Sequence, residues 1–416
     1  MEKINPAPRP KGHFNCAQHP CSKERDFTRG GVNKVLIVAG EASGDLHASN
    51  LVKAIKNIRP QIEFSGLGGE KLKEAGVDLY FNMVELAVVG FLEVLKNLTK
   101  FRKIFAGILK EVDRVKPDLA ILVDYPGFNL RLAEKLNKRR IPIIYYISPQ
   151  VWAWGANRIK TIKKVISRML VVFEFEEDLY KKNAVPVSFV GHPLLDVVKT
   201  DIAKEELFRS LGLNVNNFTF ALLPGSREKE VTSLLPIMLE TAGLLYEYLG
   251  NNIQFLVLRS ASVKEEIFNK ILKRYSFPVQ IVSNLTYNGL AASNFALVAS
   301  GTATLETAIL AKPMVILYKV SFLTWAYLKL IIKIPYIGLV NVVRKEKFIA
   351  EFIQYDARPK KIADYIARTI KDNTEMTRIK DGLSDLTSKL GEKGASSRAA
   401  QIVVEILDKT KPQPKP

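Results

Sequence analysis

FTFALLPGSREKE, residues Phe218–Glu230, indicates the architecture of this chain more clearly than any other segment. Its first six residues form an apolar run typical of a buried strand, Gly225 follows in a turn, and helix-period sequence begins directly afterwards. ALVASGTATLE, residues Ala296–Glu306, repeats this order. In a parallel sheet both turns lie at the carboxyl edge, where the N–H groups of a helix N-terminus bind anions. Two such turns in one domain predict a site for a nucleoside diphosphate.

Both turns carry residues suited to that ligand. Gly225 and Gly301 allow the backbone to approach phosphate closely, and Arg227 adds a permanently charged fork of donors. Glu306, one turn into its helix, is placed to accept hydrogen bonds from ribose hydroxyls. Further hydroxyl groups come from Ser226, Ser300, Thr302 and Thr304. The alternative for either turn alone is an ordinary connection between a strand and a helix.

Strand and helix signals alternate from Lys34 onward, in two series separated by a break at VGHPL, Val190–Leu194. This pattern predicts an α/β fold with two Rossmann-like domains, each a doubly wound parallel sheet, facing across a cleft that is the expected site. The expected parts are a disordered extension at 1–33, an N-terminal domain at 34–190, a C-terminal domain at 191–380, C-terminal helices at 381–408 and a disordered tail at 409–416.

Length and composition limit the classes of function. The chain has 416 residues, enough for two α/β domains, and its formal charge of +19 predicts a negatively charged partner: nucleic acid, anionic lipid or a phosphorylated substrate. No apolar run reaches the roughly eighteen residues of a membrane span. Cys16 and Cys21 lie in the extension, which lacks the apolar region of a secretory signal, so no disulfide framework is expected, as in the cytoplasm. Their spacing fits no zinc pattern.

The N-terminal domain opens with its own glycine turn, GEASGD at Gly40–Asp45. The spacing is not that of a dinucleotide-binding G-x-G-x-x-G motif, which disfavours NAD and FAD. It suits a loop that faces the cleft and holds a substrate hydroxyl or phosphate. The residues expected to do so are Gly40, Glu41, Ser43 and Gly44. The alternative is that Glu41 is a solvated carboxylate and Asp45 a helix cap.

Two further strands of this domain end in chemically useful residues. Asp124 follows the strand Leu119–Val123 and so emerges at the cleft edge, where a general base must stand to take a proton from an attacking hydroxyl. Its alternative is a helix N-cap. SPQVWAWGANRIK, Ser148–Lys160, follows the next strand and carries indole rings, which stack on sugars or simply pack. Its candidate substrate contacts are Gln150, Trp152 and Arg158.

The motifs GEASGD, DYPGFN, SPQVWAW, GHPLLD, LLPGSR and SGTATLE, in this order, resemble those of the lipid-A-disaccharide synthases, inverting glycosyltransferases of the two-Rossmann GT-B type. The resemblance runs from about Val35 to about Leu407 and leaves the N-terminal extension uncovered. It implies transfer of diacylglucosamine from UDP-2,3-diacylglucosamine to 2,3-diacylglucosamine 1-phosphate (lipid X). UDP is released and the β-1,6-linked lipid A disaccharide 1-phosphate is formed.

The resemblance also implies roles for individual residues. Asp124 becomes the base and Arg227 a diphosphate contact, while Asn341 is placed on a loop facing the cleft. Whether another carboxylate such as Glu41 is the base instead stays open. The residues placed around the nucleotide are Ser300, Gly301, Thr302 and Glu306. No metal and no cofactor is implied, because backbone dipoles and basic side chains neutralise the leaving diphosphate.

Acyl chains leave a membrane only for an apolar surface, and two stretches fit that demand. Val84–Leu109 is apolar on one side and basic on the other, and Ser321–Leu339 combines aromatic residues with lysines. Such segments are typical of the membrane interface, and the positive charge favours anionic lipid. We therefore expect a cytoplasmic enzyme bound peripherally to the inner face of the inner membrane. The alternatives for each stretch are a very apolar core helix or the interface of a homodimer.

Two rival functions are weighed against this interpretation. A UDP-N-acetylglucosamine 2-epimerase shares the two-domain architecture and the nucleotide site but would act without a lipid acceptor. A nucleic-acid-binding protein rests on the charge of +19 alone. No interleaved aromatic and basic motif of an RNA-binding module supports it, so nucleic acid is not an expected partner.

Overall fold

The computed structural model describes residues 32–82, 98–153, 155, 157–322, 324–326 and 335–410. Several predictions concern residues outside these ranges. They are the N-terminal extension up to residue 31, Trp154, residues 84–97 and 327–334 of the two apolar stretches, and the tail from residue 411.

The N-terminal domain contains a parallel sheet of seven described strands in the order β3-β2-β1-β4-β5-β6-β7. The strands are β1 Lys34–Ala39, β2 Glu63–Gly68, β3 Asp78–Asn82, β4 Leu119–Val123, β5 Ile143–Tyr146, β6 Arg168–Val171 and β7 Val187–Phe189. The helices between them are α1 Ala42–Ile58, α2 Glu70–Glu74, α5 Leu98–Val115, α6 Pro126–Lys138, α7 Arg158–Val165 and α8 Glu174–Lys182.

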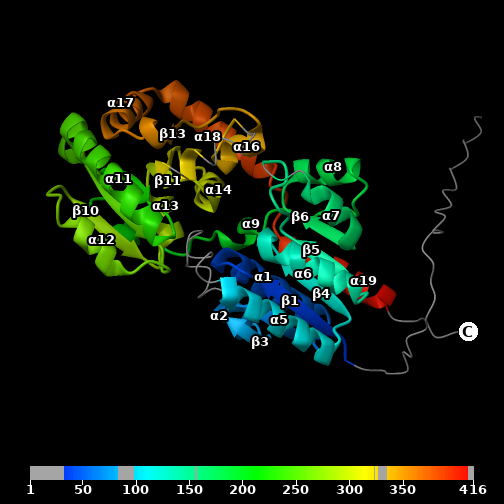
Figure 1. The fold of residues 1–416 in the computed structure, drawn as a ribbon. Coiled ribbons are helices and arrows are strands. Elements are labelled where there is room, and N and C mark those ends of the chain that lie inside the picture. Colours follow the sequence, from blue (N-terminus) through cyan, green and yellow to red (C-terminus); the bar gives the residue numbers. More distant parts are fainter. Residues whose placement is uncertain are drawn as a thin grey trace, which may run out of the picture.

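The C-terminal domain contains a second parallel sheet, of six described strands in the order β10-β9-β8-β11-β12-β13 (Figure 1). Its strands are β8 Phe218–Leu223, β9 Ile253–Arg259, β10 Val279–Ser283, β11 Phe295–Ala299, β12 Met314–Tyr318 and β13 Glu351–Ile353. Its helices are α10 Lys204–Ser210, α11 Glu228–Leu249, α12 Glu265–Leu272, α13 Thr286–Ala292, α14 Thr302–Ile309, α16 Leu339–Arg344, α17 Pro359–Thr369 and α18 Asn373–Ser388. The first six positions of the N-terminal sheet and all six of the C-terminal sheet follow the Rossmann order 3-2-1-4-5-6, so the predicted fold class is confirmed.

β1 shows why the sheets are buried on both faces. Successive side chains of a strand point to opposite faces, so Val35 and Ile37 pack into one core layer while Leu36 and Val38 pack into the other. All four are at most 1% exposed. The layer that contains Val35 also contains Leu223 of β8, so one continuous apolar core joins the two domains.

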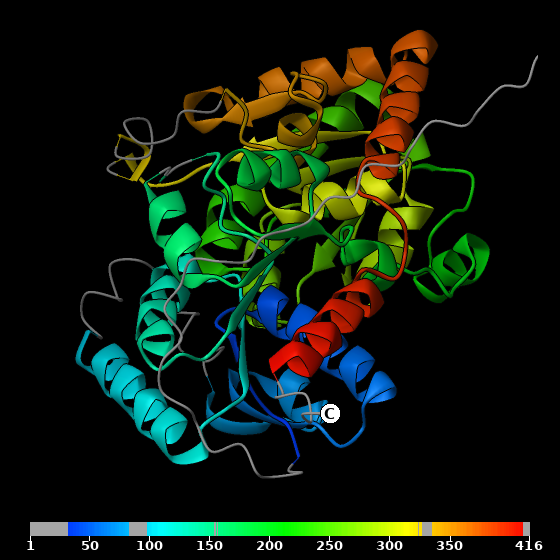
Figure 2. The same ribbon diagram turned by 90° about the vertical axis from the view of Figure 1, so that its right-hand side faces the viewer.

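The chain crosses between the domains twice, and the two crossovers are hydrogen-bonded to each other. The first contains α9, Leu194–Val197, and the second leads into α19, Ala395–Thr410, which packs on α1 of the N-terminal domain (Figures 1 and 2). The N–H of His192 donates to the carbonyl of Leu390 at 2.8 Å, and Nε of Arg398 donates to the carbonyl of Val190 at 2.9 Å. The boundary predicted at residue 381 falls inside α18, and α19 extends two residues beyond the boundary predicted at 408.

Residues 98–109, the described part of the first apolar stretch, belong to α5. Ile104, Ile108 and Val112 of this helix are at most 5% exposed and pack into the core of the N-terminal domain. The opposite face carries exposed Arg102 and Lys103. In this part of the stretch the amphipathic pattern is that of a helix packed on a sheet, which is the core-helix alternative.

Candidate active site

Asp124 lies in a tight turn directly after β4. Asp124 and Tyr125 both adopt left-handed backbone conformations, with φ of 46° and 48°, which residues other than glycine rarely adopt. Side chains hold this turn. Nδ2 of Asn129 donates to the carbonyls of Val123 (3.1 Å) and Asp124 (2.7 Å), and the Tyr145 hydroxyl donates to the Asp124 carbonyl at 2.5 Å. Tyr125, not Asp124, precedes the first residue of α6, and it makes no side-chain capping bond. The helix-cap alternative for Asp124 is therefore wrong.

The surroundings of Asp124 make its carboxylate more basic than usual. Burial, and after it the negative charge of Glu41, together raise the pKa of Asp124 to about 6, while a hydrogen bond from the backbone of Tyr125 opposes part of the shift. A carboxyl group with a pKa near 6 is still mostly ionised at neutral pH, and its basicity approaches the optimum for proton abstraction. The site therefore contains a group with the properties of a general base.

The glycine turn after β1 lies against the Asp124 turn. A Cβ atom at Gly40 would lie 2.3 Å from the ring of Tyr125, so only glycine fits beneath that ring. Ser43 is exposed in the first turn of α1, whereas Gly44 is buried. Asp45 is 4% exposed and accepts the N–H groups of Gly69, Lys71 and Leu72, so it caps α2. The cap interpretation of Asp45 is confirmed, although for a helix other than its own.

Arg227 reaches from the C-terminal domain to the N-terminal domain. Gly225 has a φ of 115°, which favours glycine, and lets the chain turn after β8. Nη2 of Arg227 lies 3.3 Å from Oε2 of Glu41, and Nη1 lies 3.3 Å from Oε1 of Glu230. Oε2 of Glu230 also accepts the N–H of Ser226 at 3.1 Å. The guanidinium is therefore held between two carboxylates, one from each domain.

The second glycine turn uses several of its polar groups internally. Ser300 donates its hydroxyl to the carbonyl of Ile337 at 3.1 Å, and Thr304, fully buried, donates to the carbonyl of Gly301 at 2.8 Å. The Thr304 hydroxyl thus donates within the turn and lies in a fully buried residue, so we no longer assign it to the nucleotide. Thr302 is exposed, and a Cβ at Gly301 would meet no atom within 4 Å. Open space thus adjoins this turn.

Glu306, in α14, is a partly buried carboxyl group. Burial raises the pKa of Glu306, and the Tyr287 hydroxyl donates to its Oε1 at 3.4 Å. It therefore retains acceptor capacity.

The placement of Asn341 contradicts its prediction. Asn341 lies in α16, not on a loop facing the cleft, and it is fully buried. Its Nδ2 donates to the Ile349 carbonyl and to Oε1 of Glu351, both at 2.8 Å, while its Oδ1 accepts the N–H groups of Phe348 (3.0 Å) and Ile349 (2.8 Å). Every hydrogen-bonding position of the amide is used within this segment. Asn341 therefore shapes the segment after α16 and does not bind substrate.

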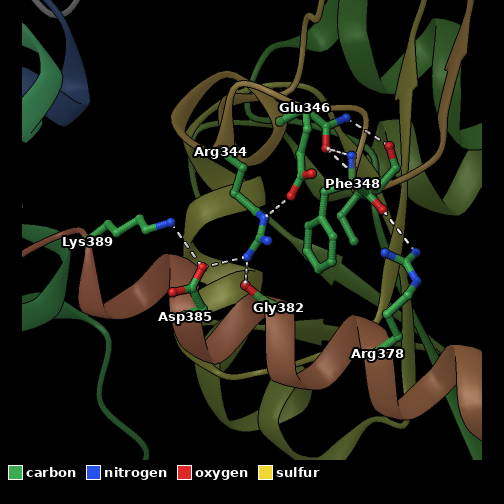
Figure 3. A network of polar contacts seen from close by, with 9 residues as sticks. Arg344, Glu346, Phe348, Arg378, Gly382, Asp385 and Lys389 are labelled. Atoms are coloured by element: carbon green, nitrogen blue, oxygen red, sulfur yellow. Dashed lines mark hydrogen bonds and ion pairs between the residues drawn. The ribbon is translucent and has the colours of Figure 1, made fainter.

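The same segment is fastened to α18 through Arg344 (Figure 3). Its guanidinium donates to the Gly382 carbonyl and pairs with Asp385, both at 2.8 Å, and it lies 4.5 Å from the centre of the Phe348 ring. Asp385 also pairs with Lys389 at 3.1 Å. These contacts fix the segment that follows β12 against the outer helix of the domain.

The loop after β5 and the start of α7 contain the remaining candidates. Gln150 is exposed, Trp152 is half-buried, and burial lowers the pKa of the Arg158 guanidinium at the first residue of α7. Nε1 of Trp152 donates at 3.0 Å to Oε1 of Glu176, a residue that sequence reasoning missed. Glu176 comes soon after β6, and its place near the carboxyl end of a strand is the signal that would have found it.

Among the candidates, the structure places Asp124 and Arg227 on either side of Glu41, which pairs with Arg227 of the other domain and raises the pKa of Asp124, whereas Asn341 and Thr304 are used within their own segments. Within the described ranges, no cluster of three or more His, Cys, Asp or Glu side chains could hold a metal ion. In the same part of the chain, no helix is long and apolar enough to cross a bilayer.

Comparison with solved structures supports the architecture. The chain resembles a UDP-GlcNAc 2-epimerase from Neisseria meningitidis bound to UDP-GlcNAc, with a TM-score of 0.59 and 13% identity over 90% of this chain and 100% of the other. It also resembles the calicheamicin glycosyltransferase, with a TM-score of 0.57 and 11% identity over 91% and 99% of the two chains. At these identities the likeness establishes the fold alone.

Comparison with known sequences is more specific. Residues 35–406 match the family model described as lipid-A-disaccharide synthetase. The chain is 44% identical over 377 residues to a lipid-A-disaccharide synthase of Syntrophus aciditrophicus, covering 90% of this chain and 98% of that one. It is 41% identical to lipid-A-disaccharide synthase 1 of Legionella pneumophila, with the same coverage of both chains. The family predicted from the ordered motifs is confirmed: the chain belongs to the lipid-A-disaccharide synthases.

Proposed function

We propose that this chain carries out the reaction of its family by a single inverting displacement, with Asp124 as the base and Arg227 as the main diphosphate contact. The chain is a hexosyltransferase: it joins UDP-2,3-diacylglucosamine to 2,3-diacylglucosamine 1-phosphate, lipid X, and forms lipid A disaccharide 1-phosphate and UDP. The observation that carries the proposed mechanism is the ion pair between Glu41 and Arg227. It holds the diphosphate turn of one domain beside the acceptor-side turn of the other.

In this mechanism, Asp124 takes the proton of the acceptor's primary hydroxyl. The oxygen attacks the anomeric carbon of the donor sugar from the face opposite UDP, and a bond from carbon to the acceptor oxygen forms as the bond to the diphosphate oxygen breaks. The electron pair leaves with UDP, and the configuration inverts from α to β. The raised pKa of Asp124, about 6, supports this role because the carboxylate is ionised at neutral pH and still basic.

The departing diphosphate needs positive charge and hydrogen-bond donors. Arg227 supplies both, since its guanidinium is exposed and its ion pairs among the described residues are with two partly exposed carboxylates, Glu41 and Glu230, which a diphosphate can replace. The N-terminus of α14 adds backbone N–H groups and the positive end of the helix dipole. The residues assigned to the nucleotide are Gly225, Ser226, Arg227, Ser300, Gly301, Thr302 and Glu306.

The sugars lie between this nucleotide site and the turns of the N-terminal domain. Glu306, still able to accept hydrogen bonds, is assigned to the ribose hydroxyls. The indole of Trp152 offers a surface for a sugar ring. The remaining substrate contacts are assigned to Gly40, Glu41, Ser43, Gly44, Gln150 and Arg158.

The enzyme is further proposed to bind peripherally to an anionic surface, the inner face of the inner membrane. The formal charge of +19, the acyl chains of both substrates and the 64% exposed side chain of Phe322 support this proposal. Sedimentation with phosphatidylglycerol vesicles, compared with phosphatidylcholine vesicles, tests it. If the protein sediments with neither kind of vesicle and light scattering gives the mass of two chains, the stretch Ser321–Leu339, which contains Phe322, is assigned to the interface of a homodimer instead.

The reaction itself is tested with purified protein and the two lipid substrates. Mass spectrometry is expected to detect the disaccharide phosphate and free UDP in equal amounts. A parallel incubation with UDP-N-acetylglucosamine alone tests the epimerase alternative, for which an epimer would form without any lipid acceptor. Absence of disaccharide together with formation of the epimer would overturn the proposed function.

A further inference from the structure

Glu176 is a buried carboxyl group that the proposed mechanism does not use. It lies in the first turn of α8, near the carboxyl end of β6, and is 1% exposed. β5 pairs with β6 in parallel, so the loop that follows β5 comes to the same edge of the sheet. This loop, Ser148–Trp152, contains two of the candidate substrate residues and is called the acceptor loop below.

Glu176 makes direct hydrogen bonds to both ends of the acceptor loop. Its Oε1 accepts the Ser148 hydroxyl at 2.7 Å and Nε1 of Trp152 at 3.0 Å. Phe175 meets the indole edge to face, with 5.5 Å between the ring centroids, so the indole is held by contacts with two successive residues of α8. Oε2 of Glu176 is buried and makes no hydrogen bond of standard length and angle to a described residue. The backbones of Phe173 and Val172 lie near the carboxyl group and lower its pKa. A carboxyl group buried to this extent is costly to maintain, which argues that its contacts serve a purpose.

Buried tyrosines connect Glu176 with the Asp124 turn. The Tyr145 hydroxyl donates to the Asp124 carbonyl, and burial, Asp124 and then Tyr180 raise the pKa of Tyr145. Burial and then Glu176 raise the pKa of Tyr180 in turn. The buried Tyr145 and Tyr180 hydroxyls therefore lie close enough to Asp124 and Glu176 for these carboxyl groups to raise their pKa values.

We propose that Glu176 is a positioning residue for the acceptor: its carboxyl oxygen fixes the acceptor loop so that the Trp152 indole meets the sugar of lipid X. This inference rests on the proposed function. At this position the loop requires one oxygen that accepts hydrogen bonds from both the Ser148 hydroxyl and the Trp152 indole N–H. Glutamine supplies that oxygen, whereas alanine leaves both donors without it.

Steady-state kinetics of Glu176→Ala and Glu176→Gln test the proposal, with Glu174→Gln, exposed on the same helix, as the matched control. We expect the alanine variant to raise the KM for lipid X about tenfold or more, because the Ser148 hydroxyl and the Trp152 indole both lose their acceptor, and to leave UDP affinity by calorimetry within about twofold. We expect glutamine to restore the KM. Equal impairment by alanine and glutamine, or an equal rise in the KM of both substrates, would overturn the proposal.

A spectroscopic test needs neither lipid nor turnover. In a variant whose only tryptophan is Trp152, made with Trp154→Phe and Trp325→Phe, the indole fluorescence reports the ionisation of its partner. Burial raises the pKa of Glu176 to about 7, with the hydrogen bonds from Ser148 and Trp152 opposing, so the emission should titrate near pH 7. Adding Glu176→Gln should abolish that titration. If the fluorescence titration persists in the glutamine variant, the contact between Glu176 and Trp152 is overturned, whether or not disaccharide is formed. If the parent enzyme forms no disaccharide, only the proposed function is overturned.

Discussion

The guanidinium of Arg227 lies 3.3 Å from the carboxylate of Glu41, although 186 residues separate them and they belong to different domains. The side chains are 61% and 39% exposed, so the pair contributes little to stability. Its importance is geometric and electrostatic. Glu41 raises the pKa of Asp124, and Arg227 is the cation proposed to meet the diphosphate, so donor binding is linked to the strength of the base.

Glu41→Gln should shift the acid limb of activity to lower pH. In the parent enzyme kcat/KM should fall as the pH drops through about 6, because Asp124 becomes protonated and cannot accept a proton. Removing the charge of Glu41 removes one cause of the raised pKa of Asp124. Profiles between pH 5 and 8 measure the shift, with exposed Glu70→Gln as the control. If the acid limb of Glu41→Gln stays where it is in the parent, Glu41 does not raise the pKa of Asp124. If Glu41→Gln loses turnover at every pH while Asp124→Asn remains active, the base is Glu41.

Asp124→Asn should lower kcat by about 100-fold or more, the usual effect of removing a general base, while calorimetry shows UDP bound as in the parent. Asparagine keeps the size of the side chain but cannot take the proton. A variant with near-normal turnover would remove Asp124 from the mechanism.

The same substitution should stabilise the fold at high pH. The folded-state pKa of Asp124, about 6, lies above its ordinary value of 3.8, so the ionised side chain disfavours the folded state above pH 6 and the effect vanishes below 3.8. Asparagine removes this cost, worth up to about 3 kcal/mol in the free energy of unfolding. Urea unfolding at pH 8 and pH 4 measures it. A gain of equal size at both pH values would show that ionisation is not the cause.

Arg227→Ala should weaken UDP binding by about 10-fold to 100-fold, the range expected when a charged hydrogen-bond donor is lost. Because the Arg227 ion pairs are exposed, the melting temperature should change little. Calorimetry with UDP measures the loss, and Arg209→Ala, exposed on α10 of the same domain, is the control. Equal affinity in the two variants would exclude Arg227 from the diphosphate site.

Compared with the parent protein, the His192→Asn variant should become more stable as the pH falls. Burial lowers the pKa of His192 to about 3, so the folded state resists protonation while the unfolded chain takes up a proton below its ordinary value of 6.5. Through His192, the free energy of unfolding of the parent protein therefore falls by about 2 kcal/mol between pH 7 and pH 5. The variant lacks this contribution. Asparagine keeps an acceptor for the Leu194 N–H, which Nδ1 of His192 accepts at 3.2 Å. Unfolding free energies of the two proteins that run parallel with pH would contradict the assignment.

Local sequence patterns were sufficient to predict the two sheets, the three glycine turns and the emergence of Asp124 at a strand end. These features depend on apolar runs, glycine and short-range spacing. The misassigned residues depend on contacts that spacing does not encode. The amide of Asn341 is used by backbone groups seven and eight residues away, and the Thr304 hydroxyl is taken by its own turn. Glu176 is one of three acidic residues in the first turn of α8, and tertiary packing, which spacing does not encode, buries it.

The paired crossovers between the domains set how the enzyme can move. Since the segments near His192 and Leu390 are bonded side by side and α19 is anchored on α1, we expect the two halves to swing about one shared axis, with sliding resisted. Each closure then restores the same alignment of Glu41 with Arg227. We therefore expect α19, a sixteen-residue helix remote in sequence from every proposed substrate contact, to limit the directions in which the two domains can move relative to each other.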